Sequence, residues 1–334
     1  MRTWIELTIE GKKVSTELSK YLKAASYREA LDGEADTLEI TLQDKDGLFM
    51  GDWFPDRGAM LELTITNERQ QMPLGDFYVD EIENTFPPSE CKIKATSIPP
   101  SSTVKAAEKW RSWEQCTLRK IASDIASGAG LSLYYESGYN PTLDRAEQSD
   151  ESDLKFLHRL CEDNGLALKL NDKQLIIFDI EKYESEGAIA ELVKGSDNIK
   201  RFSARATLNE IYSSCQVNFD SGDVDLPLSG LADGGLGGAI SSFFSKGGGK
   251  TLKLNKRVSS IGDAQRLAKK KLKAKNREET KIQLTLIGDF RLRAGATVKL
   301  SKFAMFNGKY LVQRAVHSVG SSGYTTEIEI TKVN

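Results

Sequence analysis

The sequence has few cysteines and almost no histidine. The four cysteines lie far apart with no CxxC pair, at Cys91, Cys116, Cys161 and Cys215. Neither a disulfide framework nor a cysteine-rich zinc site is therefore expected. The two histidines, His158 and His317, have no partner at metal-ligand or catalytic-triad spacing near them in the sequence. We therefore predict structural roles for both histidines, no cofactor and no catalytic activity.

The sequence also lacks an excess of either charge and a long apolar run. Lys and Arg number 46 against 48 Asp and Glu, whereas a protein that coats DNA normally has a basic excess. The most apolar run, residues 174–180, is far shorter than the roughly 20 residues of a membrane-spanning helix. Glu6 and Glu10 stand where a signal peptide needs apolar residues, so neither export nor a membrane segment is expected.

Hydrophobic residues make up 39% of the chain and charged residues 28%, which is typical of folded domains. Over the first hundred residues apolar and polar side chains alternate, in segments around Ile5–Ile9, Leu38–Leu42, Leu61–Ile65 and Cys91–Ala95. Period two predicts antiparallel strands with one buried face. The prolines at 99 and 100 end this pattern, so we place a first small β-barrel domain at residues 1–100.

The next segment changes to a helical period from about Lys105. An apolar stripe predicts one helix around residues 118–126, and a second helix is predicted from about Asp150 to Asp163. Two strands, LALKL and QLIIFDI, follow around a turn at residues 171–173. These elements predict an α/β middle domain at residues 101–194.

Period two returns in residues 195–334, for which we predict a second β-barrel domain. Its strands are expected around Cys215–Phe219, Ile282–Leu286, Val298–Leu300 and Ile328–Ile330. A glycine-rich insert at residues 221–250 and a helix at 261–276 interrupt them. Ser260 and Asp263 have the spacing of a capping box at the start of that helix. The predicted fold class is mainly β with an α+β insert, in which two similar barrels flank the middle domain.

The two β regions contain the same succession of segments. The first has GAMLEL at residues 58–63, GDFYV at 75–79 and the strand CKIKATS; the second has GATVKL at 295–300, GKYLV at 308–312 and the strand TTEIEITK. Any two antiparallel sheets show some such likeness, and two copies are few for detecting a repeat. The alternative is one barrel-like unit present twice. Such a chain closed into a threefold ring would present six similar units around one axis.

Three longer stretches resemble the phage late control D or baseplate-hub family of contractile tails, which is related to the hub part of the type VI secretion spike protein VgrG. They are QSDESDLKFLHRLCEDNGLALKL, the helix DAQRLAKKKLKAKNRE with the following TLIGDFRLRAGATVKL, and FNGKYLVQRAVHSVGSSGYTTEIEI. The resemblance extends to RGAMLELTI and GDFYVDEIE near the N-terminus. The glycine-rich insert at 221–250 matches no family motif.

The resemblance implies a structural role rather than an enzymatic one. A homotrimer with two tube-like barrels in each chain would form a pseudo-sixfold ring that joins the sixfold tail tube to the threefold central spike. The implied partners are the tube protein, the spike protein and other baseplate proteins, with at most weak contact to DNA in a lumen. The implied location is the baseplate of a virion or similar particle assembled in the bacterial cytoplasm.

Six residues are candidate contact residues at an interface. Phe243 and Phe244 are aromatic residues in the glycine-rich insert, and exposed aromatic side chains favour a partner that covers them; a self-packed or disordered loop is the alternative. Trp110 and Trp113 in EKWRSWEQ could stack on sugars or bases, but we expect them to pin a linker onto the next domain. This stretch also faintly resembles the start of a LysM-type wall-binding module.

The last two candidates, Lys270 and Lys273, belong to a basic run between Arg266 and Arg277. At helical spacing these residues surround an apolar stripe, which favours a solvated face or a salt-bridged subunit contact over nucleic-acid binding. A second function, a tail component that binds or hydrolyses peptidoglycan, stays open; turnover of purified cell wall by the chain would favour it.

Overall fold

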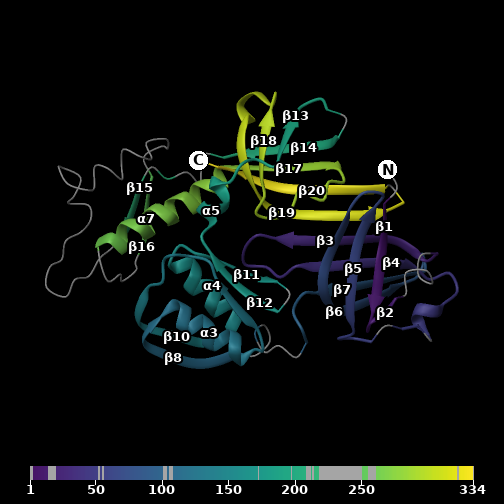
Figure 1. Cartoon of the computed structure of the whole chain (residues 1–334), viewed down its shortest axis with the longest axis horizontal. Helices are drawn as coiled ribbons and strands as arrows, with labels where there is room; N and C mark the ends of the chain where they lie inside the picture. The colour runs from purple at the N-terminus through teal and green to yellow at the C-terminus, as the bar shows by residue number, and fades with distance from the viewer. Residues whose placement is uncertain are drawn as a thin grey trace.

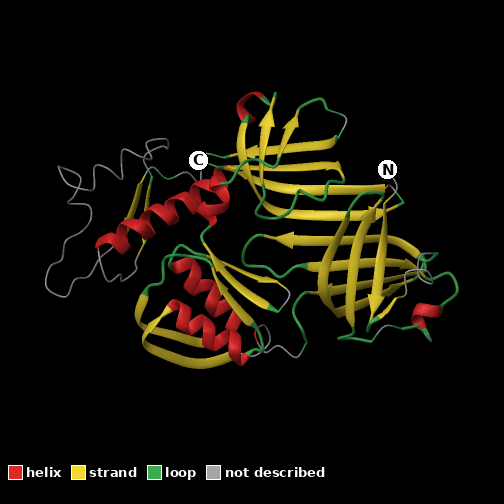
Figure 2. Ribbon diagram, in the orientation of Figure 1, coloured by secondary structure: helices red, strands yellow, loops and turns green. Residues whose placement is uncertain are grey.

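A computed structural model describes residues 3–13, 20–51, 53–54, 56–100, 104, 108–171, 173–196, 198–207, 212, 214–217, 250–254, 261–321 and 323–333. Strands dominate this part of the chain (Figures 1 and 2). Most of them belong to a single 13-stranded sheet with the order β14-β17-β20-β19-β3-β4-β7-β6-β5-β1-β2, in which β18 lies beside β19 and β13 lies beside β18. The mainly β prediction is therefore confirmed.

The first unit occupies one end of this sheet and contains the elements β1 (Thr3–Ile9), β2 (Lys12–Lys13), β3 (Leu22–Ala30), β4 (Thr37–Gln43), η1 (Leu48–Met50), β5 (Met60–Asn67), β6 (Gln71–Thr85) and β7 (Glu90–Thr96). The four strands expected from period two are β1, β4, β5 and β7. Strand β3 was not predicted. Side chains from β1 and β3–β7 meet in one core, because the alternation places one face of every strand on the same side of the sheet.

The described part of the middle segment contains, in chain order, β8 (Glu108–Thr117), α3 (Leu118–Gly128), β9 (Ser132–Tyr135), β10 (Thr142–Ser152), α4 (Asp153–Asp163), β11 (Ala167–Asn171), β12 (Gln174–Phe178) and α5 (Ile180–Ser185). The apolar stripes of α3 and α4 pack on β11 and β12 in a separate core. The expected helical period was wrong for residues 108–117, which form a strand paired with β10. The second predicted helix is confirmed, but it begins at Asp153 because Gln148–Ser152 belongs to β10.

The second unit occupies the other end of the large sheet and contains β13 (Ala190–Val193), β14 (Ile199–Ala206), β17 (Thr280–Ile287), β18 (Thr297–Ser301), η4 (Ala304–Phe306), β19 (Gly308–Gly320) and β20 (Gly323–Lys332). Its core lies between β13, β14 and β17–β20. The predicted boundary at residue 194 falls just after β13, which pairs with β18 and so lies with this unit. Closure of either unit into a barrel stays a prediction.

A smaller group of elements lies outside the large sheet. Strands β15 (Ser214–Val217) and β16 (Thr251–Leu254) pair in parallel and pack against α7 (Ile261–Asn276), which continues into η3 (Arg277–Glu279). The helix has the predicted bounds. The expected strand at Cys215 exists, but it does not join the second unit's sheet. No helix in the described ranges is both long and apolar enough to cross a membrane.

Candidate interaction surfaces

The two units are joined edge to edge by strands β19 and β3. The second half of β19 runs antiparallel to β3, with Val316 opposite Arg28 and Ser318 opposite Ser26. The hydroxyls of Ser26 and Ser318 lie 3.1 Å apart, within hydrogen-bond distance. We call this pairing the internal seam; Figure 1 shows yellow β19 beside purple β3. The seam makes one continuous sheet from residues almost three hundred positions apart.

A buried charge cluster ties the internal seam to the middle segment. The Glu29 carboxylate in β3 accepts hydrogen bonds from Lys169 Nζ of β11 at 3.0 Å and from Arg293 Nε at 2.7 Å. Lys169 Nζ also lies 3.6 Å from Asp36. Burial opposes ionisation of Glu29, but the charges of Lys169 and Arg293 outweigh it and hold the Glu29 pKa below its usual value. One acid of β3 therefore contacts both the middle segment, through Lys169, and the loop before β18 of the second unit, through Arg293.

His317 belongs to the same buried region and acts structurally, as its sequence context predicted. Its imidazole is fully buried, with Nδ1 2.7 Å from Tyr324 Oη and Nε2 3.1 Å from the Leu292 carbonyl. The ring stacks against Tyr27 of the opposite seam strand. Burial, reinforced by the nearby Arg293 charge, lowers the His317 pKa to about 4. At neutral pH this histidine is an uncharged packing residue.

The two units share one pattern of strand pairing. Met60 lies opposite Tyr78 in the first unit, and Thr297 lies opposite Leu311 at the equivalent position of the second. Just before β5 and β18 a backbone pair recurs: the amide of Val79 donates to the carbonyl of Ala59 at 3.0 Å, as Val312 does to Ala296 at 2.9 Å. The order of neighbouring strands is also the same in the two units: β3-β4-β7-β6-β5 in the first corresponds, strand by strand, to β14-β17-β20-β19-β18 in the second.

Equivalent irregularities occur at equivalent positions. Asp80 interrupts the pairing of β6 with β7, and Gln313 interrupts that of β19 with β20. Lys23 interrupts the pairing of β3 with β4, and Lys200 interrupts that of β14 with β17. A bulge shifts which side chains face the core. Two shared bulges are therefore stronger evidence for one repeated unit than shared alternation is.

The repeat leaves two edges of the sheet open. In the described ranges β14, the equivalent of β3, ends the sheet and has β17 as its one neighbour. The second half of β6, equivalent to the seam half of β19, has β7 as its one neighbour among the strands that the structure describes. We call these two strand segments, β14 and residues 81–85 of β6, the open edges. They present backbone donors and acceptors to a further strand.

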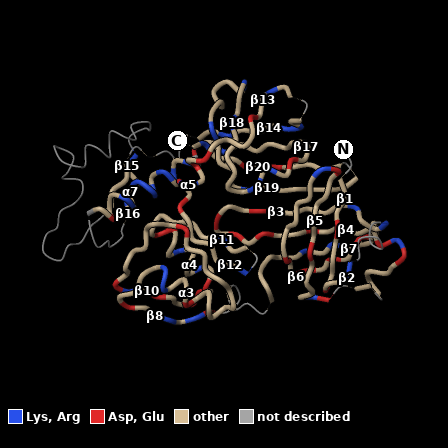
Figure 3. The backbone as a smooth tube through the Cα atoms, in the orientation of Figure 1, with Lys and Arg blue, Asp and Glu red and all other residues tan. Residues whose placement is uncertain are grey.

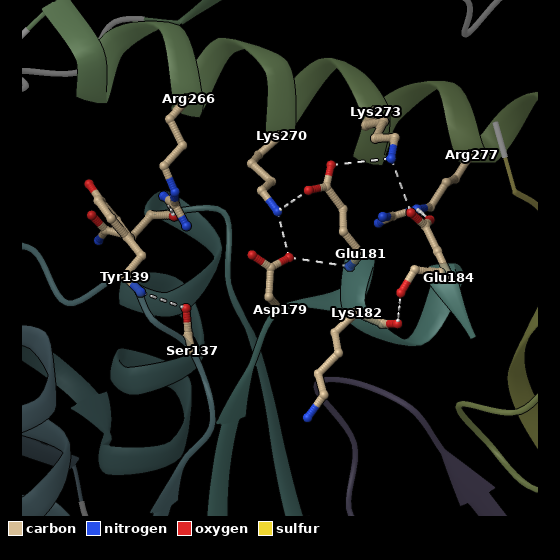
Figure 4. A network of polar contacts seen from close by, with 12 residues as sticks. Ser137, Tyr139, Asp179, Glu181, Lys182, Glu184, Arg266, Lys270, Lys273 and Arg277 are labelled. Carbon is tan, nitrogen blue, oxygen red and sulfur yellow. Dashed lines mark hydrogen bonds and ion pairs between the residues drawn. The ribbon is translucent and has the colours of Figure 1, made fainter.

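Helix α7 contacts the middle segment through ion pairs (Figure 4). Lys270 Nζ lies 2.5 Å from Asp179 and 2.6 Å from Glu181, and Lys273 Nζ lies 3.2 Å from Glu181 and from Glu184. Burial opposes ionisation of Glu181, but its bond to Lys270 and the charges of Lys270 and Lys273 lower its pKa to about 2. Figure 3 shows the blue run of α7 facing red positions around α5.

Of the six predicted interface residues, the four that the structure describes have different surroundings and are not brought together. Lys270 and Lys273 bind acidic residues of the same chain, so a subunit contact through them remains a prediction. Trp113 stacks on Phe156 with ring centroids 5.2 Å apart, whereas Trp110 is 74% exposed. Phe243 and Phe244 lie outside the described residues.

Sequence patterns did not predict two features of the first unit: the seam strand β3 and the exposed apolar side chains around η1. Strand β3 has no clean apolar alternation, because Glu29 is buried while Ala24 is half-exposed. Around η1, Met50, Trp53 and Phe54 are exposed apolar side chains; single exposed apolar residues are common in any sequence. The described residues hold no group of three or more His, Cys, Asp or Glu side chains arranged to bind a metal.

The chain is similar to phage tail proteins. Over 172 residues it is 30% identical to the probable baseplate hub protein of Escherichia phage 186, a match that covers 51% of this chain and 43% of the phage protein. The alignment thus spans less than half the length of that relative. The 43 kDa tail protein of prophage MuSo2 from Shewanella oneidensis has the same fold, with a TM-score of 0.69 at 16% identity over 99% of this chain and 98% of that one.

A third similarity extends to secretion machinery. An Escherichia coli protein described as a component of the type VI secretion system, with structural similarity to tail proteins of phage T4, aligns with a TM-score of 0.59 and 10% identity over 100% of this chain and 77% of that chain. The family model for the phage tail baseplate hub (GPD) matches residues 29–323. The match runs from the end of β3 through the whole of β19, and the chain therefore belongs to the phage tail baseplate hub (GPD) family.

Proposed function

We propose that this protein is the structural hub of a contractile tail or injection system, in which three copies close into a ring between the tail tube and the central spike. The observation that supports the proposal most directly is the repeated five-strand unit with its two shared bulges. Two such units in each of three copies give six similar units around the axis. The ring would then be sixfold toward the tube and threefold toward the spike.

The internal seam supports the same arrangement. It joins unit to unit within one chain, and each chain keeps one equivalent edge of either kind open. A contact between two different edges is heterologous, and repeated heterologous contacts close into a ring when the rotation fits. A ring of three chains then needs a single kind of strand pairing, which occurs six times. Three of these pairings are the internal seams of the three chains, and the other three join one chain to the next.

The partners follow from the family and from the proposed ring. We infer contacts with a tail tube protein, a spike protein and other baseplate proteins, and assembly in the bacterial cytoplasm before incorporation into the particle. A near-neutral total charge supports at most weak contact with DNA passing through a lumen. No cofactor and no catalytic step are part of this proposal.

Light scattering of the purified full-length protein, alone and mixed with the spike protein of the same particle, tests the ring. We expect an assembly that contains three copies of this chain in at least one of the two conditions, with the mass of the bound spike protein added in the mixture. A single-chain mass in both would overturn the proposal. Release of fragments from purified cell wall would instead support the peptidoglycan-active alternative, for which the exposed Trp110 is a candidate contact residue.

A further inference from the structure

The internal seam fixes a register that can be transferred to the open edges. Across the seam Val316 lies opposite Arg28, His317 opposite Tyr27, and Ser318 opposite Ser26. The pairing of each seam strand with its inner neighbour determines the equivalent residues in the other unit. In β6 they are Glu83, Asn84 and Thr85; in β14 they are Arg205, Ala204 and Ser203.

From this transfer we propose that β6 of one copy pairs antiparallel with β14 of the next copy, with Glu83 opposite Arg205 and Thr85 opposite Ser203. The inference rests on the proposed ring and adds to it the strands, the direction and the register of the contact between copies. Burial is consistent with the transfer. Glu83, Thr85, Ser203 and Arg205 are exposed on one face, and Asn84 and Ala204 are half-buried on the other.

Charge supports this pairing over other pairings of the same edges. The open edge of β6 has the acids Glu81 and Glu83, with Asp80 at the bulge just before it, whereas β14 has the bases Lys200, Arg201 and Arg205. Where the seam has Val316 opposite Arg28, the proposed register has Glu83 opposite Arg205. Opposite charges on directly opposed residues stabilise the pairing of two strands. Pairing of either edge with its own kind would oppose like charges, which favours a head-to-tail ring over a symmetric dimer.

Two further positions fit the same register. The hydroxyl pair of Ser26 and Ser318 in the seam becomes Ser203 and Thr85, which again places two hydroxyls opposite each other. One residue further along, Phe86 would lie near Phe202 of the next copy, as Val319 lies opposite Ala25. Phe86 is 82% exposed within one chain, and Phe202 packs with its ring centroid 4.6 Å from that of Phe303. The pairing would give the exposed Phe86 an aromatic neighbour.

Engineered disulfides test the register. In a background with the half-exposed Cys116 and Cys215 changed to Ser, Thr85→Cys with Ser203→Cys would place two cysteines directly opposite each other in adjacent copies. Asn84→Cys with Ala204→Cys tests the neighbouring pair, so that both kinds of cross-strand position are sampled. The matched control is Thr85→Cys with Arg205→Cys, a diagonal pair about 7–8 Å apart that cannot be bridged without backbone movement.

We expect mild oxidation of the full-length protein to give covalent three-chain species from at least one opposed pair and no more than background from the diagonal control. Light scattering on the same samples separates the two proposals. Three-chain assembly with no cross-link, or with a cross-link from the diagonal pair alone, would overturn the register and leave the ring. Single chains with and without the spike would overturn the ring itself.

Charge reversal provides a second readout. Glu83→Arg and Arg205→Glu should each raise the dissociation constant of the assembly about tenfold, and the double variant should restore it to within about threefold. Glu62→Arg, at another exposed acid of the same unit in β5, is the control and should leave assembly unchanged. A double variant as weak as the single variants would overturn the opposition of Glu83 and Arg205.

Discussion

The two units of the sheet share their backbone pairing but differ in the side chains along the edges that they use. In the internal seam, the uncharged Val316 of β19 lies opposite Arg28 of β3, Ser318 lies opposite Ser26, and the acid Glu29 is buried with partners. The equivalent open edges present Glu83 on β6 and Arg205 on β14. The seam forms within one chain, whereas in the proposed ring the open edges would have no strand partner until the next copy binds, and charges on an edge strand oppose nonspecific pairing.

The largest expected effect on stability comes from giving β3, the seam strand, a residue of β14, its equivalent at the open edge. Ala206 stands in β14 where β3 has Glu29, so Glu29→Ala gives the first unit the residue of the second. Removing this acid leaves Arg293 without its buried carboxylate partner and leaves Lys169 with the more distant Asp36, at 3.6 Å, which should lower the free energy of unfolding by about 3–5 kcal/mol. Urea denaturation of the full-length protein measures this difference.

The control for this substitution is Glu34→Ala. Glu34 also binds an arginine across the seam, with Arg314 at 3.0 Å, but its side chain is 52% exposed. Exposed ion pairs contribute about 0–1 kcal/mol, so this variant should be close to the parent protein. Equal losses from the two substitutions would contradict a special role for the buried cluster.

A second difference between the units is the pair of equivalent residues His317 and Asn84. Because burial lowers the folded-state pKa of His317 to about 4 from an ordinary 6.5, the unfolded chain binds a proton in this range that the folded chain does not. The contribution of His317 to stability is thus complete above pH 6.5 and is lost as the pH falls toward 4. The loss amounts to about 3 kcal/mol.

Comparing the parent protein with His317→Asn isolates this effect. The stability difference between them should shrink or reverse between pH 7 and pH 4, in proportion to the loss in the parent. Asp36 acts in the opposite direction, because burial raises its pKa to about 6, but it is present in both proteins and cancels in the difference. A difference that is constant with pH would show that His317 takes up a proton as readily in the folded protein as in the unfolded chain.

The sequence predicted most of what local pattern determines. Alternation in β1, β4, β5 and β7 and the apolar stripe of α7 were visible because each segment buries one regular face. The glycines at 58 and 295, both with positive φ, marked the start of the repeated strands. The repeat itself, and with it the ring hypothesis, was therefore available from sequence, as was the structural role of His317.

The missed strands bury polar side chains with distant partners. In β8, Lys109 and Arg111 turn inward because Asp153, which is 1% exposed, binds both of them, while Trp110 faces outward. In β3, Glu29 is buried against residues from two other parts of the chain. A hydrophobic period in the sequence cannot reveal such buried polar pairs. The strand that pairs with β3 is β19, which comes from the far end of the sequence. The open edges became identifiable once β3 was placed beside β19.

The smallest expected effect on stability is the loss of a single hydroxyl, compared between Ser318 in the internal seam and Thr85 at the open edge of β6. Ser318→Ala removes one partner of the half-buried bond to Ser26 and should destabilise the single chain by about 1 kcal/mol. At the equivalent open position the Thr85 hydroxyl donates one long, exposed bond of 3.4 Å to the Pro88 carbonyl, so Thr85→Ala should destabilise dilute single chains much less than Ser318→Ala does and should weaken assembly slightly. Unfolding measured at low and high protein concentration distinguishes the two, because association contributes to stability at high concentration alone. If Thr85→Ala destabilised the dilute chain as much as Ser318→Ala does, residue 85 would already be covered within the chain, and β6 would not be an open edge.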